Sequence, residues 1–164
     1  MARSDSESPT GIPDHANVVV LPPVLYLGAL VAGLLTQTAI GGTVFGAILP
    51  RVLIGVPLVL LGAVGSVLFA RQFEDAGQGK DPLSPTSTII RDGVFAWSRN
   101  PAYVSLTFVY LGLAVLLNNL WMFVYLVPVL VLMHYGVILR EERYLEMKFG
   151  EEYLDYKSKV RRWI

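Results

Sequence analysis

The chain has 164 residues, the size of one domain, and its apolar fraction of 54% exceeds the roughly 45–50% of soluble proteins. Its 13 basic and 13 acidic residues balance, so the sequence shows no electrostatic footprint for nucleic acid. The absence of cysteine excludes disulfides, thiolate metal sites and a cysteine nucleophile. The two histidines lie far apart in sequence, so we expect no metal site.

Four long apolar stretches predict four membrane-spanning helices, because each approaches the roughly 20 apolar residues that cross a bilayer. The predicted spans are residues 18–40, 52–70, 103–117 and 120–139. We therefore predict an all-α integral membrane protein with one domain over 18–164, preceded by a disordered polar tail over 1–17. This tail lacks the basic start and apolar core of a secretory signal, so we expect the first stretch to be retained as a span.

The connections between the spans differ in length. Residues 71–99 form a polar loop broken by glycine and proline, long enough that we expect it to be functional. Asn118-Asn119 leaves room only for a tight reversal, so the last two spans form an antiparallel hairpin. Residues 141–164 carry apolar residues at spacings of three or four, which predicts a C-terminal helix that extends the fourth span and is interrupted at Gly150.

The distribution of basic residues predicts the orientation. Eleven of the 13 lysines and arginines fall within residues 71–99 or 140–164, whereas Arg51 lies on the opposite side and Arg3 in the N-terminal tail. Basic residues favour the cytoplasmic face, so we expect the loop and both termini in the cytoplasm.

Two polar clusters flank the predicted hairpin. Residues 99–103 open the third span and residues 140–142 close the fourth, so an antiparallel hairpin brings both to one membrane face. Arg99 is equally consistent with a headgroup anchor, and Glu141-Glu142 with the solvated start of an amphipathic tail. His134, about two turns inside the fourth span, is either functional or hydrogen-bonded in the helix packing. These residues indicate a polar pocket but do not define a reaction.

Three motifs follow one another in a fixed order: residues 93–103, Glu141-Glu142-x-x-Leu145 after the hairpin, and Phe149-Gly150-Glu151-Glu152-Tyr153. Together they resemble the isoprenylcysteine carboxyl methyltransferase family. That family shares the signature Arg-His-Pro-x-Tyr … Glu-Glu-x-x-Leu with the phospholipid N-methyltransferases. The resemblance covers residues 84–164, half of the chain, and Asn100 stands where the signature has histidine.

The resemblance implies methyl transfer from S-adenosylmethionine to a lipid-like or small hydrophobic acceptor, by carboxyl O- or amine N-methylation. The cofactor would enter from the cytoplasm and lie between the hairpin and the loop, and the acceptor would arrive from the bilayer. The residues that would bind the cofactor by resemblance are Ser87, Thr88, Ile89, Ile90, Phe95, Asn100, Pro101, Ala102, Tyr103 and Glu141. Glu141 would hold the methionyl ammonium group. The catalytic candidates are Arg99, Glu142 and His134, of which Glu142 and His134 would serve as bases for an acceptor that needs deprotonation.

The chain departs from the family at several positions. Phe95 stands where tyrosine is common, and Lys80 where the eukaryotic enzymes have a glutamine that contacts the cofactor. Val137 replaces an arginine that contacts the substrate, and Arg140 is the nearest substitute, which makes it the candidate substrate residue. The methyl acceptor therefore stays open.

Two other classes of function compete with methyl transfer. A non-catalytic or transport-type bundle would need a polar path, for which spans one and two offer few polar groups and no mid-membrane acid. A membrane reductase with a nicotinamide cofactor is the third, and a comparison of NADPH with S-adenosylhomocysteine binding would separate it from the first.

Overall fold

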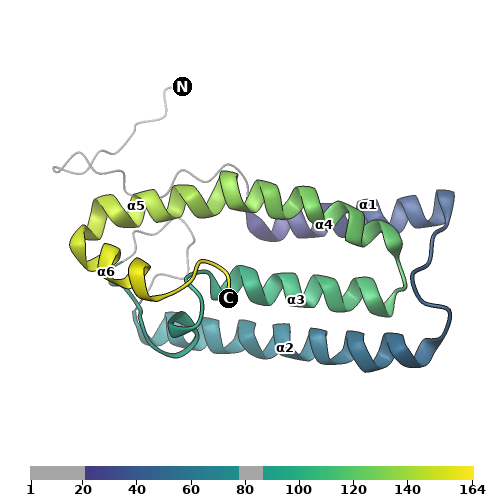
Figure 1. Ribbon diagram of the computed structural model, residues 1–164, viewed down its shortest axis with the longest axis horizontal. Helices are drawn as coiled ribbons and strands as arrows, with labels where there is room; N and C mark the ends of the chain where they lie inside the picture. The colour runs from purple at the N-terminus through teal and green to yellow at the C-terminus, as the bar shows by residue number, and fades with distance from the viewer. Residues whose placement is uncertain (1–20, 78–86) are drawn as a thin grey trace, which may run out of the picture.

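The computed structural model describes residues 21–77 and 87–164; the predicted tail 1–17, the first residues of span one and the loop residues 78–86, with Lys80, lie outside the described residues. The described part is helical. Its α-helices are α1 Pro22–Ile40, α2 Ile48–Asp75, α3 Pro101–Leu116, α4 Leu120–Met133, α5 Leu139–Phe149 and α6 Glu151–Lys159. A short 3-10 helix, η1 Gly93–Ala96, precedes α3, and a π-helical turn, η2 His134–Ile138, joins α4 to α5 (Figure 1).

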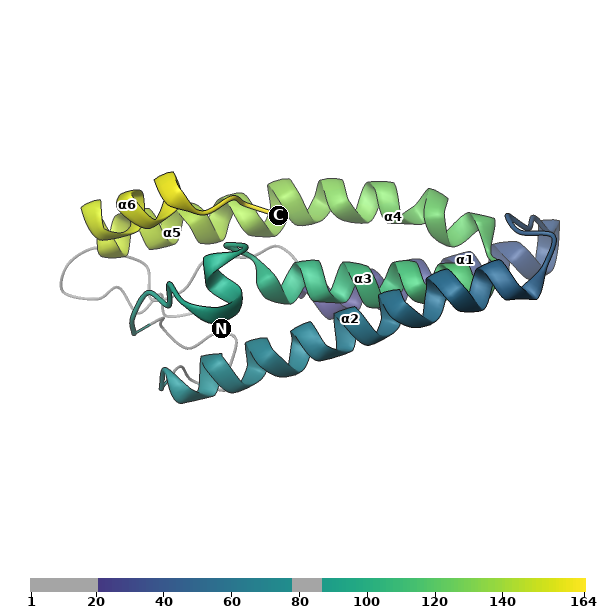
Figure 2. The ribbon, with the colours of Figure 1, turned by 60° about the horizontal axis from the view of Figure 1, so that its bottom comes forward.

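Three helical runs are long and apolar enough to cross a membrane: α1, α2 and the continuous run Leu120–Phe149. The third predicted span, 103–117, corresponds to α3, which is apolar but has 16 residues, about 24 Å of helix against a hydrocarbon core of about 30 Å. The chain is thus an all-helical integral membrane protein, as predicted, with one helix shorter than the other spans. In the view of Figure 2, α3 runs between α2 and α4.

The helices pack in two long pairs, α2 with α3 and α1 with α4, and α3 also touches α1 and α4 (Figures 1 and 2). The core that α1, α3, α4 and η2 share consists of Tyr26, Ala29, Tyr110, Ala114, Met122, Leu126, Val129, Met133 and Val137. The outward faces of α1 and α2 are also apolar: Leu27 and Leu53, for example, are exposed. Apolar side chains on both the inner and outer faces are expected of helices surrounded by lipid.

Small residues let α2 and α3 approach closely. A Cβ atom at Gly62 would lie 2.5 Å from the carbonyl oxygen of Ser105, and one at Gly112 would lie 2.7 Å from the backbone nitrogen of Val59. In membranes, where burial of apolar surface adds little to helix association, such close backbone packing holds helices together.

The turn between α3 and α4 has the tight reversal that the sequence predicts. Asn118 adopts a φ of 51°, a left-handed conformation that asparagine tolerates better than most residues. Its amide oxygen accepts hydrogen bonds from the backbone nitrogens of Val44 and Phe45 at 2.9 and 2.8 Å. Asn119 accepts from the backbone nitrogen of Met122 at 3.1 Å and so caps α4. The turn therefore also fixes the α1–α2 connection.

Two helices differ from their predicted extents. The second predicted span, 52–70, lies within the longer α2, so both flanking arginines are helical; the guanidinium of Arg51 donates to the carbonyl of Leu116 at the end of α3. The predicted helix over 141–164 begins earlier, breaks at Gly150 with a φ of 53°, and ends at Lys159. The last five residues, 160–164, leave the helix and return toward the start of α3 (Figure 1).

Candidate functional site

The polar residues of the two predicted clusters meet at one end of the bundle. The start of α3, α5, α6 and the C-terminal residues converge there, next to η1 (Figures 1 and 2). Pro101 is the first residue of α3, and Asn100 precedes it as the cap residue. Proline is tolerated there because an amide hydrogen at the first position of a helix has no partner within the helix. The cap places residues 99–103 at the end of the bundle where α5 begins.

Tyr103, on the first turn of α3, links the two clusters directly. Its hydroxyl donates a 2.6 Å hydrogen bond to Oε1 of Glu141, 38 residues later in the chain. The bond is short, as expected for a hydroxyl donating to a carboxylate. The two clusters thus meet at one end of the bundle, in agreement with the predicted hairpin.

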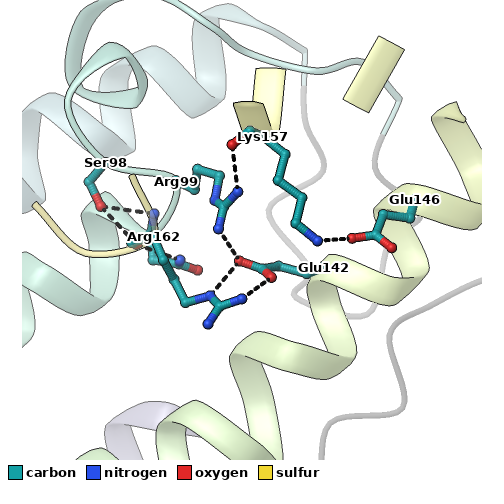
Figure 3. Close-up of polar contacts among 7 residues, drawn as sticks. Ser98, Arg99, Glu142, Glu146, Lys157 and Arg162 are labelled. Carbon is teal, nitrogen blue, oxygen red and sulfur yellow. Dashed lines mark hydrogen bonds and ion pairs between the residues drawn. The ribbon is translucent and has the colours of Figure 1, made fainter. Parts of the chain in front are cut away.

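Glu142, the next residue on α5, is held by two arginines (Figure 3). Arg99 approaches Oε1 with Nη2 at 2.9 Å. Arg162 binds both carboxylate oxygens, with Nε at 2.9 Å from Oε1 and Nη2 at 2.8 Å from Oε2. The side chains of Glu142 and Arg99 are only 5% and 7% exposed, so this ion pair is buried. The Glu142 carboxylate raises the pKa of Arg162, which favours its charged form.

The C-terminal residues also bind the start of α3 through their backbone. The carbonyl of Arg161 accepts from the backbone nitrogen of Arg99 at 3.0 Å. The carbonyl of Arg162 accepts from Nδ2 of Asn100 at 2.8 Å and from Oγ of Ser98 at 3.3 Å. Since these bonds occupy the Asn100 amide nitrogen, its side chain ties the tail to α3.

The segment before α3 is fastened to two other helices. The side chain of Gln72, on α2, donates to the carbonyl of Asp92 at 2.8 Å and accepts from the backbone nitrogen of Val94 at 3.1 Å. On α6, Tyr156 donates to the carbonyl of Phe95 at 2.7 Å. Burial raises the pKa of Tyr156 to about 12, so this hydroxyl keeps its proton near neutral pH. The η1 segment is therefore held in place from both sides.

Other predicted site residues lie on η1, on the segment before it, and on the first turns of α3 and α5. The ring of Phe95 is 5.8 Å from that of Phe69 on α2, and Pro101 is buried while Ala102 is half-buried. Ser87 and Thr88 are exposed and Ile89 and Ile90 half-buried on the approach to η1, and Arg140 is exposed on the first turn of α5.

His134 lies apart from the two clusters. It begins η2, eight residues before Glu142, about 12 Å along a helix axis, and its ring packs edge-on against Tyr135 at 4.8 Å. Val137, at the position where the resembling family has an arginine, is 1% exposed in the core. The geometry thus favours a packing role for both positions.

The two adjacent carboxylates have different surroundings. Glu142 is bound by two guanidinium groups, which makes it a poor proton acceptor and favours a structural role for it. Glu141, in contrast, accepts its hydrogen bond from the neutral hydroxyl of Tyr103. Its negative charge is therefore suited to a cationic ligand.

Arg162 is the residue of this centre that we do not predict from the sequence. The pair Arg161-Arg162 beside Trp163 has the composition of an interfacial anchor, and Arg162 lies 20 residues from its partner Glu142. A spacing of 20 within a helix continued past Gly150 would place the two about 30 Å apart, so no local pattern reveals the pair.

The fold and this centre define the class of protein: an integral membrane helical bundle with a polar site at one end. The family model for phospholipid methyltransferase matches residues 50–152, which include both clusters. The chain belongs to this family.

Curated relatives match shorter parts of the chain. It is 40% identical over 85 residues to protein-S-isoprenylcysteine O-methyltransferase of Mus musculus, a match over 47% of this chain and 27% of the relative. The corresponding enzyme of Saccharomyces cerevisiae is 36% identical over 72 residues, 44% of this chain and 30% of the relative. An uncharacterized protein of Haemophilus influenzae is 40% identical over 62 residues, 38% of this chain and 98% of the relative. The chain thus spans less than a third of the curated methyltransferases that it matches, and no solved structure matches it.

Proposed function

We propose that this protein is an S-adenosylmethionine-dependent methyltransferase that acts on a lipid-like or small hydrophobic acceptor. The observation that carries the proposal is the Tyr103–Glu141 hydrogen bond, which joins the two family motifs at one end of the bundle. The hydroxyl of Tyr103 orients this carboxylate without neutralising it, so a cationic ligand is able to pair with it; the cofactor carries an ammonium and a sulfonium.

The residues present fit such a ligand. Glu141 would hold the ammonium group, with Tyr103 fixing the orientation of its carboxylate. Arg99 has a buried Nε for which the described residues offer no hydrogen-bond partner, so a donor for a carboxylate lies next to the same centre. An amino-acid zwitterion needs this combination of a negative and a positive group.

The chain would contribute positioning more than acid–base chemistry. The bound cofactor supplies an activated methyl group for in-line displacement. The residues that hold it and the helices that admit the acceptor would align the two, and alignment alone supplies up to about 7–11 kcal/mol of a reaction barrier. A carboxylate acceptor needs no base, which agrees with a centre whose second carboxylate is occupied by arginines. For an amine or thiol acceptor, a base would have to come from His134 or from the acceptor's own surroundings.

The transport alternative gains no support from α1 and α2. Thr36 is hydrogen-bonded to Tyr125 at 3.0 Å, and Ser66 to the carbonyl of Gly62 at 2.9 Å. These polar side chains are satisfied within the helix packing, which leaves them ill placed to line a path.

Titration calorimetry of the detergent-solubilised full chain with S-adenosylhomocysteine tests the proposal, with NADPH as the comparison ligand. We expect binding of S-adenosylhomocysteine only. Absence of binding at about millimolar ligand, a free energy weaker than about 4 kcal/mol, would overturn the proposal.

The acceptor class follows from a labelling experiment on membranes. Methyl-labelled S-adenosylmethionine is incubated with the protein and a total lipid extract, and the labelled product is then treated with alkali. A methyl ester releases its label as methanol, whereas an N-methyl group keeps it, so one measurement separates carboxyl from amine methylation.

A further inference from the structure

The C-terminal segment Val160–Ile164, here called the strap, lies across the start of α3 after α6 ends. In Figure 1 its end lies beside the first turn of α3. Five residues with no regular secondary structure would be expected to fray at a chain end. Here hydrogen bonds to Ser98, Arg99 and Asn100 fasten them instead.

One residue of the strap, Arg162, holds both elements that form the Tyr103–Glu141 pair. Its carbonyl accepts from the Asn100 side chain, the cap of the helix that carries Tyr103. Its guanidinium binds both oxygens of Glu142, the neighbour of Glu141 on α5 (Figure 3). The backbone and side chain of a single residue therefore link the start of α3 to the start of α5.

We propose that Arg162 is a positioning residue for the cofactor site, an inference that rests on the function proposed above. The strap holds α3 and α5 at the separation at which the Tyr103 hydroxyl and the Glu141 carboxylate act together on an amino-acid zwitterion. Without the guanidinium, Arg99 alone binds Glu142, and the start of α5 is held less firmly against α3.

The neighbouring arginine supplies a matched control. The backbone carbonyl of Arg161 accepts a hydrogen bond from Arg99. Arg161 itself is exposed, and its side chain makes no hydrogen bond or ion pair with the described residues. Arg161→Gln therefore removes the same charge as Arg162→Gln, one residue away, without touching Glu142. Arg162→Lys keeps the charge but loses the two parallel bonds, because an ammonium group cannot bind a carboxylate as a planar fork does.

The experiment measures the Kd for S-adenosylhomocysteine by calorimetry on the full chain and these three variants, well below each unfolding transition. Helix content from circular dichroism verifies that each variant is folded. We expect Arg162→Gln to weaken binding by about tenfold or more, Arg162→Lys by about threefold, and Arg161→Gln by less than about twofold. A purely structural role would lower the unfolding temperature of Arg162→Gln but leave its Kd unchanged.

The outcomes separate this inference from the proposed function. If the wild-type protein does not bind S-adenosylhomocysteine, the proposed function falls and this inference with it. If it binds and folded Arg162→Gln binds equally well, the positioning role is refuted while the proposed function stands. Should Arg162→Gln fail to fold, Arg162→Lys decides: a Kd within about twofold of wild type refutes the role, and graded weakening supports it.

Discussion

Replacing Glu142 with glutamine tests whether the buried arginine–carboxylate centre stabilises the fold. The substitution keeps the shape of the side chain but removes the charge that balances Arg99 and Arg162. Arg99 is then a buried cation without a carboxylate, since its side chain is only 7% exposed. The Arg162 side chain, 29% exposed, is able to recover part of its hydration.

The magnitude follows from these burials. Removing one partner of a buried ion pair destabilises a protein by about 3–5 kcal/mol. Because Arg162 regains hydration and the glutamine oxygen still accepts a hydrogen bond, we expect a loss of about 3 kcal/mol here. For a chain of this size, about 3 kcal/mol lowers the unfolding temperature by roughly 6–12 °C. Thermal unfolding of the detergent-solubilised protein, followed by circular dichroism, measures the shift.

Glu151→Gln is the control, because Glu151 is exposed at the start of α6 and the substitution removes the same charge. We expect a shift within about 2 °C for this control, since exposed substitutions change stability by about 0.5 kcal/mol or less. An unfolding temperature for Glu142→Gln that equals the control would refute the argument, because the ion pair would then contribute nothing beyond an exposed charge.

Three further predictions concern other parts of the molecule. Glu141→Ala and Tyr103→Ala are each expected to weaken S-adenosylhomocysteine binding by about tenfold or more, measured by calorimetry, with unchanged helix content, because they remove the proposed ammonium partner and its orienting donor. Gly62→Leu is expected to lower the unfolding temperature by several degrees, because a Cβ there meets α3 backbone, whereas Gly28→Leu, which has open space, leaves it within about 2 °C. Asn118→Ala is expected to unfold at a lower temperature than Asn118→Gly. Both variants lose the hydrogen bonds to the α1–α2 connection, but only glycine adopts the φ of 51° without strain. Equal unfolding temperatures would contradict this prediction.

The features predicted well from the sequence are those with a local physical cause. The apolar stretches predict the helices because a lipid-exposed helix needs apolar residues on every face. The turn at Asn118-Asn119 allows only an antiparallel hairpin, and this hairpin brings Tyr103 to Glu141. Chain direction alone therefore predicts that the two clusters lie at one end of the bundle, but not that Tyr103 and Glu141 are in contact.

Features that depend on distant contacts or on backbone continuity are harder to predict. Hydropathy indicates which residues lie in the lipid, but it does not show where a helix ends. The helix α2 extends past both predicted boundaries because its backbone hydrogen bonds continue there. The π-helical turn η2 has no compositional pattern that marks it. The return of the strap depends on ion pairs between residues 20 positions apart, which sequence spacing does not reveal.

The adjacent carboxylates Glu141 and Glu142 show how one helix turn supports two roles. Neighbouring residues of an α-helix point about 100° apart, so the two side chains meet different partners. Glu142 faces Arg99 and Arg162, and these ion pairs hold α5 against the start of α3 and the strap. Glu141 meets the neutral hydroxyl of Tyr103, and no ion pair within residues 21–77 and 87–164 balances its charge. The first carboxylate of the motif is therefore the one suited to a cationic ligand, and the second keeps it in position.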